Sequence, residues 1–186
     1  MRNLIKYIIL FIPLTTYGQD KELFEYINIY RVTNHVRAVE WSDKLTEERS
    51  SYLINLLITK KQETGDTSYL FHNPKGGWEN VALIPKLVSE KGFDVFLDRY
   101  YNTPPFNPTT LVDTNKYIKL YLVYMWVLSP KHNKNLLNKS HKYMGADTSI
   151  KDVKYQDNKR TMFGKTTTYT TKPFLDMTTY GVINFE

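Results

Sequence analysis

The order of two kinds of pattern most constrains what this chain can fold into. Apolar residues recur at helical spacing through most of the chain, whereas the last forty or so residues are rich in threonine, tyrosine and valine, which favour strands. Helices followed by strands, with few alternations, favour an α+β layered domain over a doubly wound parallel sheet. We therefore expect the C-terminal part of the chain to build an antiparallel sheet.

The same patterns predict where the individual elements lie. Helices are expected over about 20–32, over 42–57 with Ser42 as the N-cap, over 94–101 and over 117–128. Strands are expected near 142–155, 161–171 and 179–185. The glycine-rich stretch 65–77 predicts a loop that carries His72, and the proline-rich stretch 103–108 predicts an exposed arm.

The first eighteen residues have the pattern of a signal peptide. Arg2 and Lys6 flank the start of an apolar run over 7–14, and small or polar residues continue to Gly18. The apolar run is far shorter than the roughly 20 residues that cross a bilayer, so no transmembrane anchor is expected. We predict a signal peptide over 1–18, one domain over 19–186, and a secreted or periplasmic location. A buried N-terminal element is the alternative, and Pro13 fits it poorly.

Cysteine and charge exclude several classes of function. The chain has no cysteine, which removes disulfides, thiolate metal sites and thiol nucleophiles together. An exported protein without disulfides relies on its packed core, which favours a bacterial or phage source. The formal charge is +6, of which the predicted signal peptide carries two through Arg2 and Lys6. The lysines are scattered and no nucleic-acid-binding motif accompanies them, so a nucleic-acid partner is not expected.

Three short motifs appear in the order found in one known family. Residues 126–137 read WVLSPKHNKNLL and resemble the W-x-x-S-P-x-H-x-x-N-[IL]-[LM] signature of short prokaryotic CAP (or SCP) domains. The name covers the cysteine-rich secretory, antigen 5 and pathogenesis-related proteins. Residues 79–82 resemble the family's G-E-N-[IL]-A turn, and Phe71 with His72 resembles the element before it. The opening N-x-x-R helix at Asn28 and Arg31 agrees too, and the resemblance spans 27–185.

The resemblance implies an α-β-α sandwich, with a central antiparallel sheet between helices and an open cleft on one face. In that cleft the family places two histidines and two acids. Residue by residue, His72 matches the first histidine, Glu79 the first acid and His132 the second histidine. The second acid would fall on Ser129, three residues beyond Trp126, and serine cannot replace a carboxylate.

The chain also departs from the family in two places. Ala82 and Trp126 are separated by forty-three residues, where the family passes quickly between the two motifs. An insertion at about 86–115 is implied, which includes the proline-rich arm with Phe106 near its tip. Trp78 stands where the family prefers glycine, and its indole could close over the cleft or pack against the inserted helix.

The candidate site residues leave several chemical interpretations open. His72 and His132 can hold a zinc ion, or can form a hydrogen-bonded pair without metal. Glu79 is the candidate catalytic residue: its carboxylate could take a proton from bound water, orient an imidazole, or cap a helix. We expect the cleft to include Glu79, Trp78, Asn80, Ser129, Asn135 and Phe106. No nucleophile elbow surrounds Ser129, so a helix end before Pro130 is the better account of it.

Three functions follow from these expectations. The first is an exported binding module whose cleft holds a small or lipid-like ligand, as the family's sterol- and fatty-acid-binding members imply. The second is a metal-dependent, protease-like hydrolase that uses His72, His132 and Glu79, with zinc as cofactor. The third is a surface protein that contacts an extracellular protein partner through the inserted arm. Fold alone decides between none of them.

Overall fold

The computed structural model describes residues 20–65, 70–73, 77–88, 90–108, 111–155, 158–162, 165–169 and 174–186. The predicted signal peptide lies outside the described residues. The helices are α1 (Lys21–Thr33), α2 (Asp43–Leu45), the π-helical segment η1 (Thr46–Ser51), α3 (Tyr52–Thr64), α4 (Lys91–Tyr101), α5 (Leu111–Leu128) and α6 (Pro130–Leu136). The strands are β1 (Glu40–Trp41), β2 (Trp78–Val88), β3 (Tyr143–Tyr155), β4 (Asn158–Met162), β5 (Lys165–Tyr169) and β6 (Phe174–Phe185).

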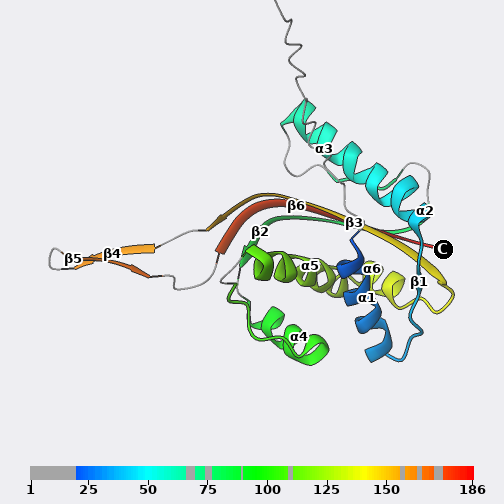
Figure 1. Ribbon diagram of the computed structural model, residues 1–186, viewed down its shortest axis with the longest axis horizontal. Helices are drawn as coiled ribbons and strands as arrows, with labels where there is room; N and C mark the ends of the chain where they lie inside the picture. Colours follow the sequence, from blue (N-terminus) through cyan, green and yellow to red (C-terminus); the bar gives the residue numbers. More distant parts are fainter. Residues whose placement is uncertain are drawn as a thin grey trace, which may run out of the picture.

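Four of the strands form one sheet in the order β1-β3-β6-β2 (Figure 1). β6 runs antiparallel to both β2 and β3, whereas the two-residue strand β1 runs parallel to β3. The mixed helical and strand content confirms the α+β class. The expectation of a wholly antiparallel sheet is wrong at β1. The chain that leaves α1 runs beside β3 in the same direction as β3, so the two strands pair in parallel.

Two expectations about the strands are also corrected. β2 was not predicted, although it is one of the longer strands of the sheet. Its apolar pattern is interrupted by Pro85, which lies where the register with β6 shifts between Ile84 and Lys86. A proline is tolerated at such a bulge in an edge strand, and β2 lies at one edge of the sheet. The predicted strand over 161–171 is instead parts of two strands, since β4 and β5 pair with each other in a separate sheet.

Two of the predicted helix starts are confirmed by their caps, whereas α4 and α5 begin at Lys91 and Leu111, before the predicted starts at 94 and 117. The Asp20 carboxylate accepts a hydrogen bond from the Leu23 amide at 2.9 Å, and this begins α1. The Ser42 hydroxyl accepts from the Leu45 amide at 3.1 Å, as expected for an N-cap. α5 ends at Leu128 and α6 begins at Pro130, so Ser129 marks a helix boundary.

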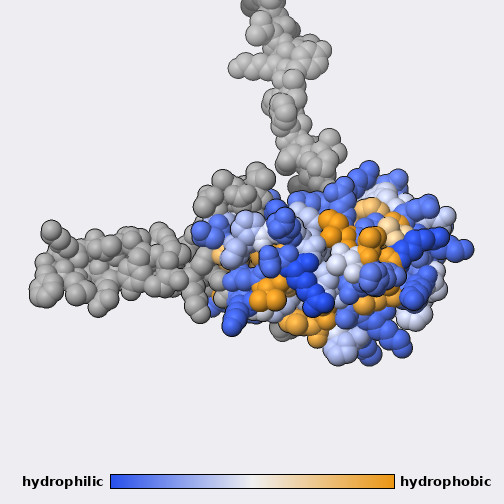
Figure 2. All heavy atoms as spheres, turned by 90° about the horizontal axis from the view of Figure 1, so that it is seen from below, coloured by the Kyte–Doolittle hydropathy of each residue, from blue (hydrophilic) through white to orange (hydrophobic). Residues whose placement is uncertain are grey.

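Helices lie on both faces of the four-stranded sheet (Figure 1). α1, α4 and α5 lie on one face and bury the larger core, which includes Trp126 and rings from α4 and α5. α3 lies on the other face over a small apolar cluster made of Leu53, Ile54, Leu57, Val81, Tyr180 and Val182. Figure 2 views the molecule from the side of α4, where apolar side chains are interspersed among hydrophilic ones. Among the described residues, no helix is both long and apolar enough to cross a membrane.

The proline-rich arm does not present Phe106 to solvent. The Phe106 ring is 3% exposed and lies 5.3 Å from the Tyr117 ring and 6.3 Å from the Phe93 ring, between centroids. Its amide donates to the Asp94 carboxylate at 2.8 Å. α4 and α5 therefore supply the apolar surface that buries Phe106, which has no apolar partner within the arm itself. The expectation of Phe106 as an exposed tip or cleft residue is wrong. Its ring is therefore not available to a binding partner of the arm.

Candidate ligand-binding pocket

A pocket of about 840 Å³ lies where β2, the loop before it and α6 meet. β2 contributes Trp78, Glu79 and Asn80, and the preceding loop contributes His72 and Gly77. The remaining lining residues come from α6 and the turn that follows it: Lys131, His132, Lys134, Asn135, Leu137, Asn138 and Lys139. All three motifs singled out in the sequence therefore contribute to one pocket.

The alternation of β2 places its polar side chains on opposite sides of the strand. Glu79 shares its parity with Val81, which packs in the cluster under α3, whereas Asn80 shares its parity with Ala82 and Ile84 in the larger core. Because β2 is the last strand in the order of the sheet, both of its sides can contribute to a pocket at this edge.

The Glu79 carboxylate is buried and holds the loop before β2. Its Oε1 accepts from the Asn73 amide at 3.0 Å and lies 3.0 Å from Nδ1 of His72. The Glu79 side chain is only 4% exposed, whereas that of His72 is 68% exposed. Glu79 lies inside a strand, so the helix-cap interpretation is wrong. Its contact with Nδ1 favours the imidazole-orienting role and leaves Nε2 of His72 free to face a ligand.

His132 lines the same pocket from α6. Burial lowers the pKa of His132, and the charges of His72 and Lys131 lower it further. A lowered pKa keeps this imidazole neutral at pH 7. The main chain of His132 is fixed as well, because its carbonyl accepts a hydrogen bond from Nδ2 of Asn80 at 3.1 Å.

A buried chain of side chains forms the floor on the α6 side. Nδ2 of Asn135 donates to Oδ1 of Asn80 at 2.8 Å, and Nε2 of His141 lies 3.0 Å from Oδ1 of Asn135. Asn135 Oδ1 is an acceptor, so Nε2 of His141 carries the proton. Burial lowers the pKa of His141 to about 4, with a further contribution from Arg31, so the ring is neutral. Asn135 thus joins β2 to the segment that precedes β3.

His141 supports the lining residue Asn135 and was not expected near the site. The lining residues that were not expected in the cleft are Gly77, Lys131, Lys134, Leu137, Asn138 and Lys139. His141 lacks neighbouring motif partners, which predicts a surface or strand-edge position, but it is 3% exposed. Its ring stacks on Phe185 with 4.5 Å between centroids and meets the edge of Trp78 at 5.7 Å. No sequence pattern marks it. Arg31, by contrast, belongs to the N-x-x-R motif, and its buried guanidinium donates to the carbonyls of Leu136 and Asn138 below the pocket.

Two of the expected cleft residues are not part of the pocket. Ser129 is half-buried at the N-cap of α6 and does not line it. Phe106 belongs to the core between α4 and α5. In the part of the chain that the structure describes, no group of three or more histidine, aspartate and glutamate side chains is close enough to hold a metal ion. A metal at His72 and His132 would therefore need water or a ligand to complete its coordination.

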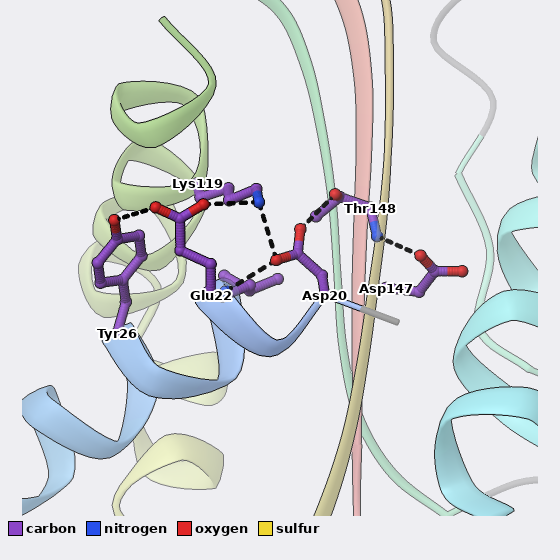
Figure 3. Close-up of polar contacts among 7 residues, drawn as sticks. Asp20, Glu22, Tyr26, Lys119, Asp147 and Thr148 are labelled. Carbon is purple, nitrogen blue, oxygen red and sulfur yellow. Dashed lines mark hydrogen bonds and ion pairs between the residues drawn. The ribbon is translucent and has the colours of Figure 1, made fainter. Parts of the chain in front are cut away.

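A second polar cluster joins α1, α5 and β3 (Figure 3). Lys119 of α5 forms ion pairs with Asp20 at 3.0 Å and Glu22 at 2.8 Å, and Thr148 of β3 donates to Asp20 at 2.5 Å. Burial alone would lower the pKa of Lys119, but the two carboxylates outweigh it and raise that pKa. Because these groups are paired with one another, we interpret the cluster as a structural contact that holds α1, α5 and β3 together.

Comparison with known proteins adds no family to these observations. No protein-family model matches the chain, and no curated protein matches it either.

Proposed function

We propose that this chain is an exported binding protein of the CAP type, an α-β-α sandwich whose pocket between β2 and α6 holds a small ligand. The observation that carries the proposal is the pocket itself, whose volume of about 840 Å³ falls within the range of small-molecule sites. The residues that match the CAP motifs, His72, Glu79 and His132, all line it. Helices on both faces of the sheet also fit the proposed sandwich (Figure 1).

The rigid floor supports a binding role. Asn80, Asn135 and His141 are bonded to one another and are each less than 10% exposed, so their positions are fixed before a ligand arrives. A site held in place by buried hydrogen bonds loses less conformational entropy on binding than one that must be ordered. Trp78 offers the ligand an apolar surface, because it is 59% exposed at the pocket while its ring edge is held against His141.

Binding of an uncharged fluorophore tests this proposal. N-phenyl-1-naphthylamine should bind the wild-type protein with saturable fluorescence enhancement, and Trp78→Ala should weaken binding at least about tenfold, because an aromatic contact is lost. Val95→Ala is the matched control, since Val95 is 57% exposed on α4, outside the pocket. Equal affinities of the wild-type and Trp78→Ala proteins would contradict the proposal.

A zinc ion at His72 and His132 is the second proposal. Two observations favour it: both imidazoles line one pocket, and the lowered pKa of His132 keeps that ring in the neutral form that metals bind. The contact between Glu79 and Nδ1 of His72 is the arrangement that orients a metal-binding imidazole. Bound zinc would supply a Lewis acid, which the hydrolase alternative requires.

Calorimetric zinc titration tests this second proposal. We expect one site in the wild-type protein, and its loss in both His72→Ala and His132→Ala. His35→Asn is the control, because His35 is exposed and has a φ of 58°, which asparagine tolerates. Zinc binding that survives both alanine substitutions would place the metal elsewhere and remove the basis for the hydrolase.

A further inference from the structure

One side of the pocket carries three lysines that form no ion pair with an acid of the described residues. Lys131, Lys134 and Lys139 all line the pocket, and all three are exposed. Within the described ranges, none of these three lysines forms an ion pair with a carboxylate. The three lysines therefore contribute positive charge to the pocket that is not cancelled by a neighbouring carboxylate.

The acid in the lining does not offset this charge. Glu79 is the carboxylate among the described lining residues, and its side chain is 4% exposed. Its Oε1 is already engaged by the Asn73 amide and by His72. Because this carboxylate is buried on the other side of β2 from Asn80 and α6, a ligand at the lysines meets a positive surface.

Helix stability explains one of these lysines but not another. Lys134 lies in the last turn of α6, where a cation is favoured by the helix dipole. Lys131 lies in the first turn, where the same dipole disfavours a cation and where α6 has no acid. Its charge also acts on His132 inside the pocket. The stability of α6 therefore does not account for the position of Lys131.

We propose that the ligand of this pocket is a small organic anion. Its carboxylate, sulfate or phosphate group faces Lys131, Lys134 and Lys139, and its flat apolar or aromatic body lies against Trp78. This proposal rests on the proposed binding function and names the ligand class. The rigid floor of the site adds little specificity for charge, because the amides of Asn80 and Asn135 already bond each other.

A matched pair of probes tests the charge preference. 8-Anilinonaphthalene-1-sulfonate carries a sulfonate on nearly the same aromatic body as the uncharged N-phenyl-1-naphthylamine. We expect Lys131→Gln/Lys134→Gln to weaken sulfonate binding at least about tenfold and to change binding of the uncharged probe less than about twofold. Added salt should weaken binding of the sulfonate probe only, since surface charges are screened.

Lys44→Gln/Lys91→Gln is the control, because both lysines are exposed and lie outside the pocket. It removes the same charge and should leave both affinities unchanged. Thermal melts establish that each variant is folded. Competition with benzoate, phenyl sulfate and phenyl phosphate then ranks the anionic groups.

The possible failures are distinguishable. If neither probe binds the wild-type protein, the binding function and this inference both fall. If both probes bind and the pocket lysine variant keeps the sulfonate affinity, only the inference is overturned. Displacement by heparin far more strongly than by the three small anions would also overturn it, in favour of a polyanionic macromolecule.

Discussion

The two faces of the four-stranded sheet are built on different principles. The face toward α1, α4 and α5 buries a continuous aromatic core, in which Phe93 lies 4.9 Å from Tyr121 and 5.3 Å from Tyr124 between ring centroids. The face toward η1 and α3 buries a small apolar cluster beside a row of polar side chains. We infer that the first face contributes most of the free energy of folding. The second face contributes less, because it also buries the polar row that includes Glu79 of the pocket.

The polar row crosses three strands. Glu79 of β2 lies opposite Asn184 of β6, which lies opposite Gly145 of β3, and Asp147 follows two residues later on the same side. Asn184 donates to the Ser50 hydroxyl of η1 at 3.1 Å. In the described residues, one buried oxygen each of Glu79, Asp147 and Asn184 has no hydrogen-bond partner. Unpartnered buried oxygens are costly, so this row weakens the face that it occupies.

The largest expected effect is on the aromatic face. Phe93→Ala should lower the free energy of unfolding by about 3–5 kcal/mol, because it empties a fully buried site between α4 and α5. Chemical denaturation measures this difference. Leu57→Ala on the α3 face should cost less, since its apolar cluster is smaller. A larger loss for Leu57→Ala than for Phe93→Ala would reverse the comparison of the two faces.

The next effect concerns the buried imidazole under the pocket. Folding lowers the pKa of His141 to about 4 from its ordinary value of 6.5, so the fold favours the neutral ring. The stability that this gives is present above about pH 6.5 and is lost as the pH falls toward 4. We expect it to account for about 2 kcal/mol of the stability lost by the wild-type protein between pH 7 and pH 5.

His141→Gln tests that expectation, because glutamine keeps a donor for Asn135 and does not titrate. Its unfolding free energy should fall less steeply between pH 7 and pH 5 than that of the wild-type protein. Parallel pH slopes for the two proteins would mean that His141 does not titrate on unfolding in this range.

An effect of similar size and opposite sign is expected from the polar row. Burial raises the pKa of Asp147 to about 6 from 3.8, with Asp20 adding to the shift and with Ser51 and the Thr148 amide opposing it. The fold therefore favours the protonated carboxyl, and stability is lost as the pH rises from about 4 to 6. Asp147→Asn should raise the unfolding free energy at pH 7 by about 1–3 kcal/mol. Destabilisation at pH 7 would show that the ionised carboxylate has a favourable partner.

The sequence predicted local structure well and tertiary burial poorly. The Asp20–Val32 helix and the Ser42 cap depend on spacing and on one side-chain bond, so they can be recognised without a fold. The family resemblance identified His72, Glu79 and His132 as a group, and the structure places all three in one pocket. The roles of these residues stay predictions.

The errors have a common physical cause. Phe106 has no apolar neighbours within its own arm, and only the packing of α4 against α5 buries it. His141 is covered by Phe185 and Trp78, which are distant in sequence. β2 is interrupted by Pro85, which is compatible with a strand only at a bulge such as the one beside β6. In each of these cases the structure depends on contacts with residues distant in sequence, which a local sequence pattern does not record.

The most direct test of the central claim is to map where a ligand binds. Two-dimensional ¹H–¹⁵N NMR of the labelled protein, titrated with 8-anilinonaphthalene-1-sulfonate, reports a shift for each backbone amide. We expect the largest shifts at residues 78–80 and 131–139, with the indole NH of Trp78 among them. Shifts concentrated on α4 and the arm at 103–108, with the amides of β2 and α6 unchanged, would contradict this expectation.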